Sequence, residues 1–202
     1  MKKKPPWVGH QKGAQKMELF IEWCMECPDI KRVTVFALSS ENLNRPKEEV
    51  QALWDVYKQT LKKYVTDPRI KKHEIKVRVL GDDGVWEPSF KDMVGEVVNS
   101  TRNYSKHVLN IMLAYGSKFE INRAIKEVIK KPIKTIDKTL LVKEPLDLII
   151  RTGGQCRLSD FMLYQASYAE IYFSNTLWPE FTKKEFDKII KWYYEQQKNF
   201  GR

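Results

Sequence analysis

The stretch VTVFALSSENLNRPKEEVQALW, residues 33–54, decides the fold of this chain. It opens with branched and apolar side chains, which are typical of a short buried strand. A polar segment follows, and after Pro46 the residues Val50, Leu53 and Trp54 recur at spacings of three and four, which predicts a helix. Because parallel sheets are built from strands that lead into helices, the stretch predicts an α/β protein.

The same alternation continues along the chain. Further strands are predicted at 75–80, 108–113, 146–150 and 171–173. Helices are predicted at 10–27, after Pro46, at 86–102, at 118–129, from Ser159 to Glu170 and after the Thr182 capping box. The segment 130–145 is predicted as a surface connection that contains some helix. We therefore expect a single domain over residues 1–202, with a mainly parallel central sheet covered by helices.

Composition narrows the class of protein. With 42% hydrophobic and 31% charged residues, the chain falls in the globular range. No apolar run approaches the roughly 18 residues of a membrane span, so we expect a cytoplasmic protein with at most peripheral contact with a membrane surface. Cys24, Cys27 and Cys156 do not form a disulfide framework, and the C-x-x-C pair lacks further metal ligands nearby.

The net charge of +10 would attract polyanions, which leaves nucleic acid, anionic lipid and diphosphate substrates open. Basic and aromatic residues are not interleaved as in nucleic-acid-binding modules. We therefore expect no nucleic acid partner, and steeply salt-dependent duplex binding would contradict this expectation.

The first polar segment, SSENLNRP at residues 39–46, follows a predicted strand and precedes a helix. It brings the hydroxyl of Ser39, the amide of Asn42 and the guanidinium of Arg45 to the carboxyl end of that strand. Ligands bind at this edge in open α/β sheets, and helix N-termini favour anions. A polar turn that only caps the helix explains the same residues equally well.

The second polar segment, RTGGQCRLS at residues 151–159, also follows a strand. Arg151, Arg157, a glycine pair and Ser159 suggest a phosphate cradle, since guanidinium groups match phosphate oxygens and glycines allow close approach of the backbone. Glu170, before the last strand, could reach a divalent cation shared with a diphosphate, although a single Glu there is usually solvated. His10 could donate to an anion at the first helix N-terminus, although such residues are more often on the surface.

Several motifs occur in order between Gly9 and Gly201: FALSSENLNRP at 36–46, AYG at 114–116, RTGG and RLSDF within 151–161, YAEIYF at 168–173 and LWPEF at 177–181. Together they resemble the cis-prenyltransferases of the undecaprenyl diphosphate synthase type. The resemblance implies a dimeric, Mg²⁺-dependent transferase that condenses isopentenyl diphosphate with an allylic diphosphate, farnesyl or geranylgeranyl. The products are a cis-polyprenyl diphosphate, grown in an apolar tunnel and released with peripheral membrane contact, and pyrophosphate.

The resemblance also implies roles for individual residues. Arg151, Arg157 and Ser159 would hold isopentenyl diphosphate, and Glu170 would ligate its Mg²⁺. Asn42 and Arg45 would position the condensing pair, with Ser39 beside them. His10 would face the allylic diphosphate, and Glu49 matches a carboxylate near the cleft. The helix face with Leu53, Trp54 and Tyr57 would line the tunnel, although the same residues serve equally well as core.

The chain also departs from the family pattern. Family members begin with a strand that ends in Asp-Gly-Asn-x-Arg-Trp, and nothing in residues 1–8 matches it. Leu43, Gln155 and Asn199 stand where many members carry an aromatic residue, Glu and Arg. We therefore weigh a homodimeric enzyme against an alternative, an impaired or truncated chain that acts as a subunit of a heteromeric cis-prenyltransferase. The retained Asn42 and Arg157 favour the enzyme.

Overall fold

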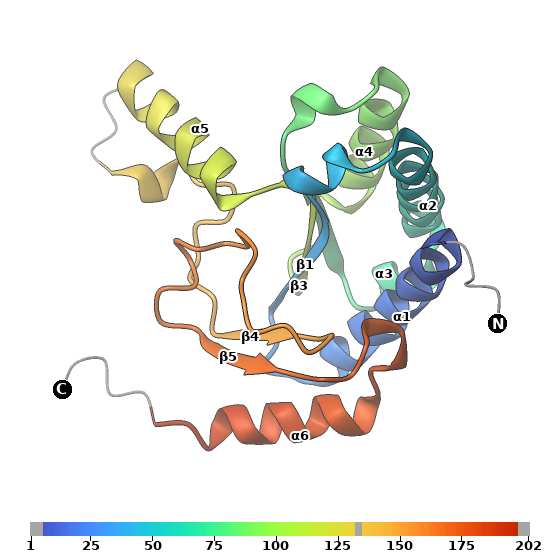
Figure 1. Ribbon diagram of the computed structural model, residues 1–202, viewed down its shortest axis with the longest axis vertical. Coiled ribbons are helices and arrows are strands. Elements are labelled where there is room, and N and C mark those ends of the chain that lie inside the picture. The colour runs from blue at the N-terminus through green and yellow to red at the C-terminus, as the bar shows by residue number, and fades with distance from the viewer. Residues whose placement is uncertain (1–5, 132–134, 198–202) are drawn as a thin grey trace. The chain divides into compact units, whose positions relative to one another are not determined.

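The computed structural model describes residues 6–131 and 135–197 (Figure 1). The chain divides into two units, residues 1–143 and 144–202, and each is considered by itself. In the first unit, β1 (Arg32–Ser39), β2 (Ile75–Leu80) and β3 (His107–Tyr115) form a parallel sheet in the order β1-β3-β2. In the second, β4 (Leu148–Arg151) pairs in parallel with β5 (Glu170–Phe173). The predicted α/β class with parallel strands is confirmed, and one domain over residues 1–202 stays a prediction.

Helices surround these strands. The first unit contains α1 (Pro6–Glu26), α2 (Lys47–Thr66), α3 (Pro68–Lys72), α4 (Pro88–Thr101) and α5 (Ser117–Lys130), with short 3₁₀ helices η1 (Ser40–Asn44), η2 (Asp83–Val85) and η3 (Ile136–Lys138). The second contains η4 (Trp178–Glu180) and α6 (Lys183–Tyr194). The region before Pro6, on which the prediction about the family's first strand partly falls, lies outside the described residues.

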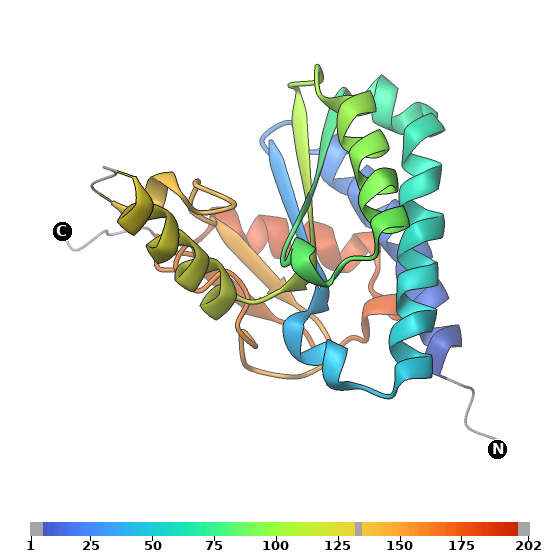
Figure 2. The same ribbon diagram turned by 90° about the horizontal axis from the view of Figure 1, so that it is seen from above.

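The core of the first unit lies around its central strand. From Leu109 to Tyr115 only Asn110 is polar, and all these residues are buried, as expected for a strand with neighbours on both sides. Figure 2 shows α1, α2 and α4 alongside this sheet. Phe90, Val94 and Val97 of α4 are buried at helical spacing, which explains why this amphipathic segment folds as a helix here.

Two predictions about the connections are wrong. The segment from Ser159 to Glu170 is a series of turns and no helix, because Ser159, Asp160 and Met162 have φ angles of 50°, 63° and 42°. Left-handed residues interrupt the ladder of helical hydrogen bonds. Glu170 therefore opens β5 and closes no helix.

The connection at 130–145 does not run wholly over the surface, because Leu140 and Val142 are buried. The buried carboxylate of Glu120 accepts a hydrogen bond from the Leu141 N–H at 2.7 Å, and Arg78 Nη2 donates to the Leu141 carbonyl at 2.7 Å. A buried carboxylate that binds backbone N–H groups gives no periodic signal in a sequence, which is why the pattern missed it.

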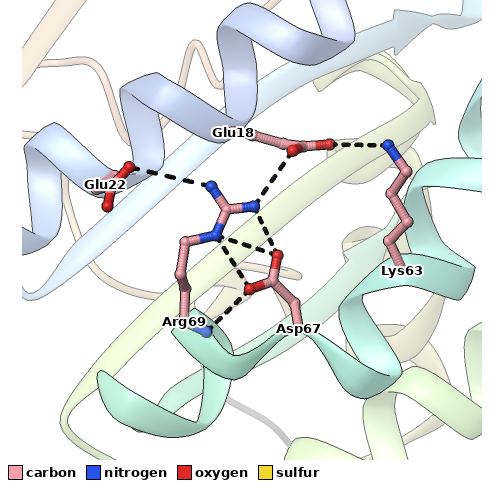
Figure 3. A network of polar contacts seen from close by, with 5 residues as sticks. All are labelled: Glu18, Glu22, Lys63, Asp67 and Arg69. Carbon is pink, nitrogen blue, oxygen red and sulfur yellow. Dashed lines mark hydrogen bonds and ion pairs between the residues drawn. The ribbon is translucent and has the colours of Figure 1, made fainter.

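An ion-pair network joins α1 to the α2–α3 junction (Figure 3). Arg69 contacts Asp67 at 2.7 Å and Glu18 at 3.2 Å, and Lys63 contacts Glu18 at 3.4 Å. Asp67 also caps α3 by accepting the Arg69 N–H at 2.9 Å. Because the guanidinium is shared between Glu18 of α1 and Asp67, which lies between α2 and α3, the network links α1 to that junction.

Asn in place of Asp67 keeps an acceptor for the α3 cap but removes the charge, so we expect a loss of about 1 kcal/mol in the free energy of unfolding at neutral pH. The hydrogen bond from Arg69 holds the pKa of Asp67 below its usual range. The stabilisation is therefore complete above the unfolded pKa of about 4 and is lost as the pH falls through the lower folded value. Urea unfolding of both proteins across this range checks it, with Asp55→Asn as an exposed control. A difference that stays constant to about pH 2 would contradict the network's role.

Candidate active site

At the end of β1, Ser39 and Asn42 hold each other in place. Ser39 Oγ accepts the Asn42 backbone N–H at 3.2 Å, and Asn42 Oδ1 accepts the Ser39 N–H at 3.2 Å. Because an N–H can bond only to an acceptor, this exchange fixes which end of the amide faces Ser39. Ser39 and Asn42 thus form a helix cap, as the sequence suggested, but they cap η1 and not α2. The two donors of the Asn42 NH₂ group are left for another partner.

Arg45 follows this turn and is oriented by the next helix. Its Nη1 lies 2.8 Å from Glu49 Oε1, one turn into α2, with the Arg45 side chain 41% exposed. An exposed pair of this kind contributes little to stability. Its effect is to restrict a long, positively charged side chain close to Asn42, and the remaining guanidinium donors can still meet an anion.

The carbonyl of Ala114, within the AYG motif, joins the carboxyl ends of the strands. Ser40 Oγ donates to it at 3.3 Å, and the Asp82 N–H, after β2, donates at 3.1 Å. Ala114 reaches this position with a φ of 52°, which is uncommon for a residue with a side chain. The turn after β1 is thus tied to β3 and β2 at the edge where ligands bind in such sheets.

Tyr57 anchors α2 to β1 in a way the sequence did not reveal. Its hydroxyl donates to the carbonyl of Ala37, at which the register of β1 against β3 shifts. Burial raises the pKa of Tyr57, so it stays a neutral donor. In the sequence, the position of Tyr57 on the apolar face of α2 indicates that its ring is buried, but it does not indicate which group its hydroxyl bonds.

The tunnel predicted along Leu53, Trp54 and Tyr57 stays a prediction. Leu53 is buried, and the Trp54 ring contacts Phe90.

In the second unit, the structure joins Arg151 to Ser159, and Arg157 lies in the same loop. Arg151 Nη1 donates to Ser159 Oγ at 3.0 Å, and Arg157 Nη1 donates to Gln155 Oε1 at 2.6 Å. Burial and, second, the charge of Arg157 lower the pKa of Arg151. Arg151 Nε is buried with no hydrogen-bond partner among the described residues, so this guanidinium still has a donor for an anion.

The glycine pair does not form the predicted backbone cradle. Gly153 and Gly154 have φ angles of 89° and 72°, so both adopt a left-handed turn. Their N–H groups donate to the carbonyls of Thr176 and Ser174, each at 2.9 Å. These donors are used inside the protein, which leaves side chains to bind an anion at this turn.

Glu170 is not brought to the arginines within the β4–β5 pair. The register pairs Leu148 with Glu170 and Arg151 with Phe173, so Glu170 and Arg151 lie at opposite ends, about 10 Å apart along the strands. Side chains alternate between the faces of a sheet, and three residues of offset place these two on opposite faces. The described residues also contain no group of three or more His, Cys, Asp or Glu that could hold a metal. A Mg²⁺ ion carried by a diphosphate takes one or two carboxylates besides phosphate oxygens and waters, so ligation of the ion by Glu170 stays a prediction.

His10 is not at a helix N-terminus, because α1 begins one turn earlier, at Pro6. The side chain of His10 lies outside the described residues, so its facing an allylic diphosphate stays a prediction. Cys24 is 2% exposed, which agrees with a core residue.

Comparisons with known proteins agree with the fold and the motifs. A family model described as "Putative undecaprenyl diphosphate synthase" matches residues 1–201. A tritrans,polycis-undecaprenyl-diphosphate synthase (geranylgeranyl-diphosphate specific) from Pyrococcus abyssi is 38% identical over 100% of this chain and 81% of its own length. An isoprenyl transferase from Aquifex aeolicus is 35% identical over 98% of this chain and 87% of its own length.

Solved structures are similar as well. A probable undecaprenyl diphosphate synthase from Campylobacter jejuni superimposes with a TM-score of 0.87 and 34% identity, covering 95% of this chain and 92% of its own. A lavandulyl diphosphate synthase from Lavandula x intermedia, in complex with dimethylallyl diphosphate, has a TM-score of 0.88 and 26% identity, covering 97% and 89%.

The fold, the motifs and these relatives define an enzyme of the prenyltransferase class, which condenses isopentenyl diphosphate with an allylic diphosphate. The chain belongs to the undecaprenyl diphosphate synthase family of cis-prenyltransferases.

Proposed function

We propose that Arg151, Arg157 and Ser159 bind the diphosphate of isopentenyl diphosphate. The observation that carries this proposal is the state of the Arg151 side chain: its Nη1 donates to Ser159 Oγ, and its Nε is buried with no hydrogen-bond partner among the described residues. Ser159 orients Arg151, and its hydroxyl can also donate to a phosphate oxygen. Guanidinium forks bind phosphate in a bidentate manner, which would hold the substrate in one orientation.

In the first unit, we propose that Asn42 and Arg45 contact the condensing pair, with Ser39 and Glu49 as the groups that orient them. The reaction breaks the bond between the allylic C1 and its diphosphate oxygen and forms a bond from C1 to C4 of isopentenyl diphosphate. A proton then leaves C2, and pyrophosphate is released. Amide and guanidinium donors directed at the leaving oxygen stabilise the negative charge that develops there.

The allylic starter we propose is geranylgeranyl diphosphate. Relatives such as that from Pyrococcus abyssi are named as geranylgeranyl-diphosphate specific. Faster turnover with farnesyl diphosphate than with geranylgeranyl diphosphate would contradict this choice. The product is then a long cis-polyprenyl diphosphate.

We keep a homodimer as the proposed assembly and peripheral membrane contact as the proposed route of product release. No helix among the described residues is long and apolar enough to cross a membrane. An impaired subunit of a heteromeric enzyme is not favoured, because such a chain has no need of Asn42, Arg45 and the arginine pair.

Mg²⁺ dependence is the prediction that tests the chemistry most directly. We expect the purified chain to incorporate labelled isopentenyl diphosphate into extractable lipid with geranylgeranyl diphosphate and Mg²⁺, and to stop with EDTA until Mg²⁺ is restored. Mg²⁺ would neutralise diphosphate charge when bound. Product that forms equally well in EDTA would exclude the metal requirement, and absence of product with retained substrate binding would favour the heteromeric alternative.

The role of Glu170 can be read from the same assay. Because it lies away from the arginines, we expect Glu170→Gln to bind isopentenyl diphosphate with wild-type affinity in the absence of metal. A rise of about tenfold or more in the Mg²⁺ concentration for half-maximal activity would assign the carboxylate to the metal. An unchanged Mg²⁺ curve would remove Glu170 from the metal site.

A further inference from the structure

Ser174, the residue after β5, is buried and makes several hydrogen bonds. It lies outside the sequence motifs and has no part in the proposed reaction. It is 4% exposed. Its N–H donates to the Arg151 carbonyl at 2.8 Å, and its own carbonyl accepts the Gly154 N–H at 2.9 Å. Its Oγ donates to Glu185 Oε1 at 2.5 Å and accepts the Thr176 N–H at 3.0 Å. Ser174 thus bonds through both its backbone groups and its side chain.

These bonds determine the path of the turn that carries Arg151. The partners of the Ser174 backbone are the first and last residues of the segment 151–154. Between them, the Gly153 N–H donates to the carbonyl of Thr176, and Thr176 is itself held by Ser174 Oγ. Ser174 therefore holds both ends of this turn. Thr176, which Ser174 positions, holds its middle.

Glu185 connects this arrangement to α6. It lies in the first turn of the helix, and its N–H donates to the capping Thr182 Oγ1 at 3.2 Å. The next residue, Phe186, and Ile189 are buried at 1% and 0% exposure, which anchors that end of the helix in the core. The carboxylate of Glu185 is half-buried on an anchored helix, so rotation of the Ser174 hydroxyl away from it would break a charge-assisted hydrogen bond.

We infer that Ser174 and Glu185 are positioning residues for isopentenyl diphosphate binding: they hold the backbone of Arg151 so that its guanidinium stays beside Ser159, to which it donates at 3.0 Å. The inference rests on the proposed role of these arginines in substrate binding. Neither residue needs to touch the substrate. Misplacement of a binding group by about 1 Å can cost on the order of a hundredfold in rate, so a partial loosening of the turn should be measurable.

The test compares Ser174→Ala, Glu185→Leu and the double variant with the wild-type enzyme. We expect each single change to raise KM for isopentenyl diphosphate by about five- to twentyfold, with kcat within about twofold, because substrate binding is loosened and the reacting atoms are not contacted. The double variant should be no worse than the poorer single variant, because both remove the same bond. Glu185→Gln keeps an acceptor for the hydroxyl and should retain a KM within about twofold of wild type.

Asp187→Ala is the matched control. It removes an exposed ion pair of 2.6 Å with Lys183 in the same first turns of α6, without involving Ser174. Its KM should equal that of the wild type. Each variant is assayed well below its own Tm, so that a loss of stability does not count as a loss of binding.

Three results would overturn the inference: a lower Tm with unchanged KM, additive effects in the double variant, or an equal rise in KM in Asp187→Ala. Arg157→Ala separates this failure from failure of the proposed function. If Arg157→Ala weakens substrate binding but the Ser174 and Glu185 variants do not, only the inference fails. If Arg157→Ala binds normally, the proposed site itself is wrong.

Discussion

Alanine in place of Gly81 should destabilise the protein by at least about 3 kcal/mol, and we expect much of the variant to be unfolded at 37 °C. Gly81 follows β2 with a φ of 152°, a conformation that residues with a side chain rarely adopt. A Cβ atom built there would lie 1.8 Å from the carbonyl oxygen of Leu113, in the central strand β3. Because that oxygen belongs to backbone, no change of rotamer can relieve the clash.

Thermal and urea unfolding of the two proteins measure this effect. For a chain of this length a loss of about 3 kcal/mol lowers Tm by about 6–12 °C. Gly95→Ala is the control, because Gly95 lies in α4 and a Cβ there would have no atom within 4 Å. That change should be neutral or stabilising by up to about 1 kcal/mol. A Gly81→Ala protein as stable as the wild type would mean that β2 and β3 do not approach as described.

Arg157→Ala should weaken isopentenyl diphosphate binding by about 2–4 kcal/mol, a loss of about 30- to 1,000-fold in affinity. Without substrate, Arg157 is exposed and bonds to Gln155, so its removal should change Tm little. With substrate, it would supply one of the two guanidinium groups that share a diphosphate, and Arg151 alone cannot neutralise that charge.

Calorimetric titration with isopentenyl diphosphate checks the affinity directly. Lys188→Ala removes the same unit of charge from an exposed position on α6 and should bind normally. If both variants lose affinity equally, general electrostatic attraction explains binding and the arginine pair is not the site. Normal affinity in Arg157→Ala removes this residue from the site.

Most of the secondary structure could be predicted from hydrophobic periodicity. β2 was predicted at its observed bounds, and β1 and β3 extend the predicted ranges by one or two residues at each end. The prediction of a helix from Ser159 to Glu170 was wrong because a Ser that could cap a helix does not reveal the left-handed φ angles at Ser159 and Asp160. The same residue type is common in turns.

From the sequence, the types of residue in the candidate site could be predicted, but most of their spatial arrangement could not. The sequence placed Arg151, Arg157 and Ser159 in one short loop; the structure joins Arg151 to Ser159, and the binding role of the three residues stays a prediction. The sequence could not show that the glycine N–H groups are used internally or that Glu170 lies at the far end of its strand. Both depend on strand register and on partners distant in sequence, which no local pattern encodes.

The reciprocal bonds between Ser39 and Asn42 also determine when the entropy cost of ordering the Asn42 side chain arises. A free asparagine side chain would have to be ordered on every substrate encounter, at a cost of about 0.5–1.5 kcal/mol. Here the amide orientation is set when η1 folds, so an anion bound as we propose would meet donors that are already oriented. Such preorganisation would let this small polar turn take part in each catalytic cycle without a further ordering cost.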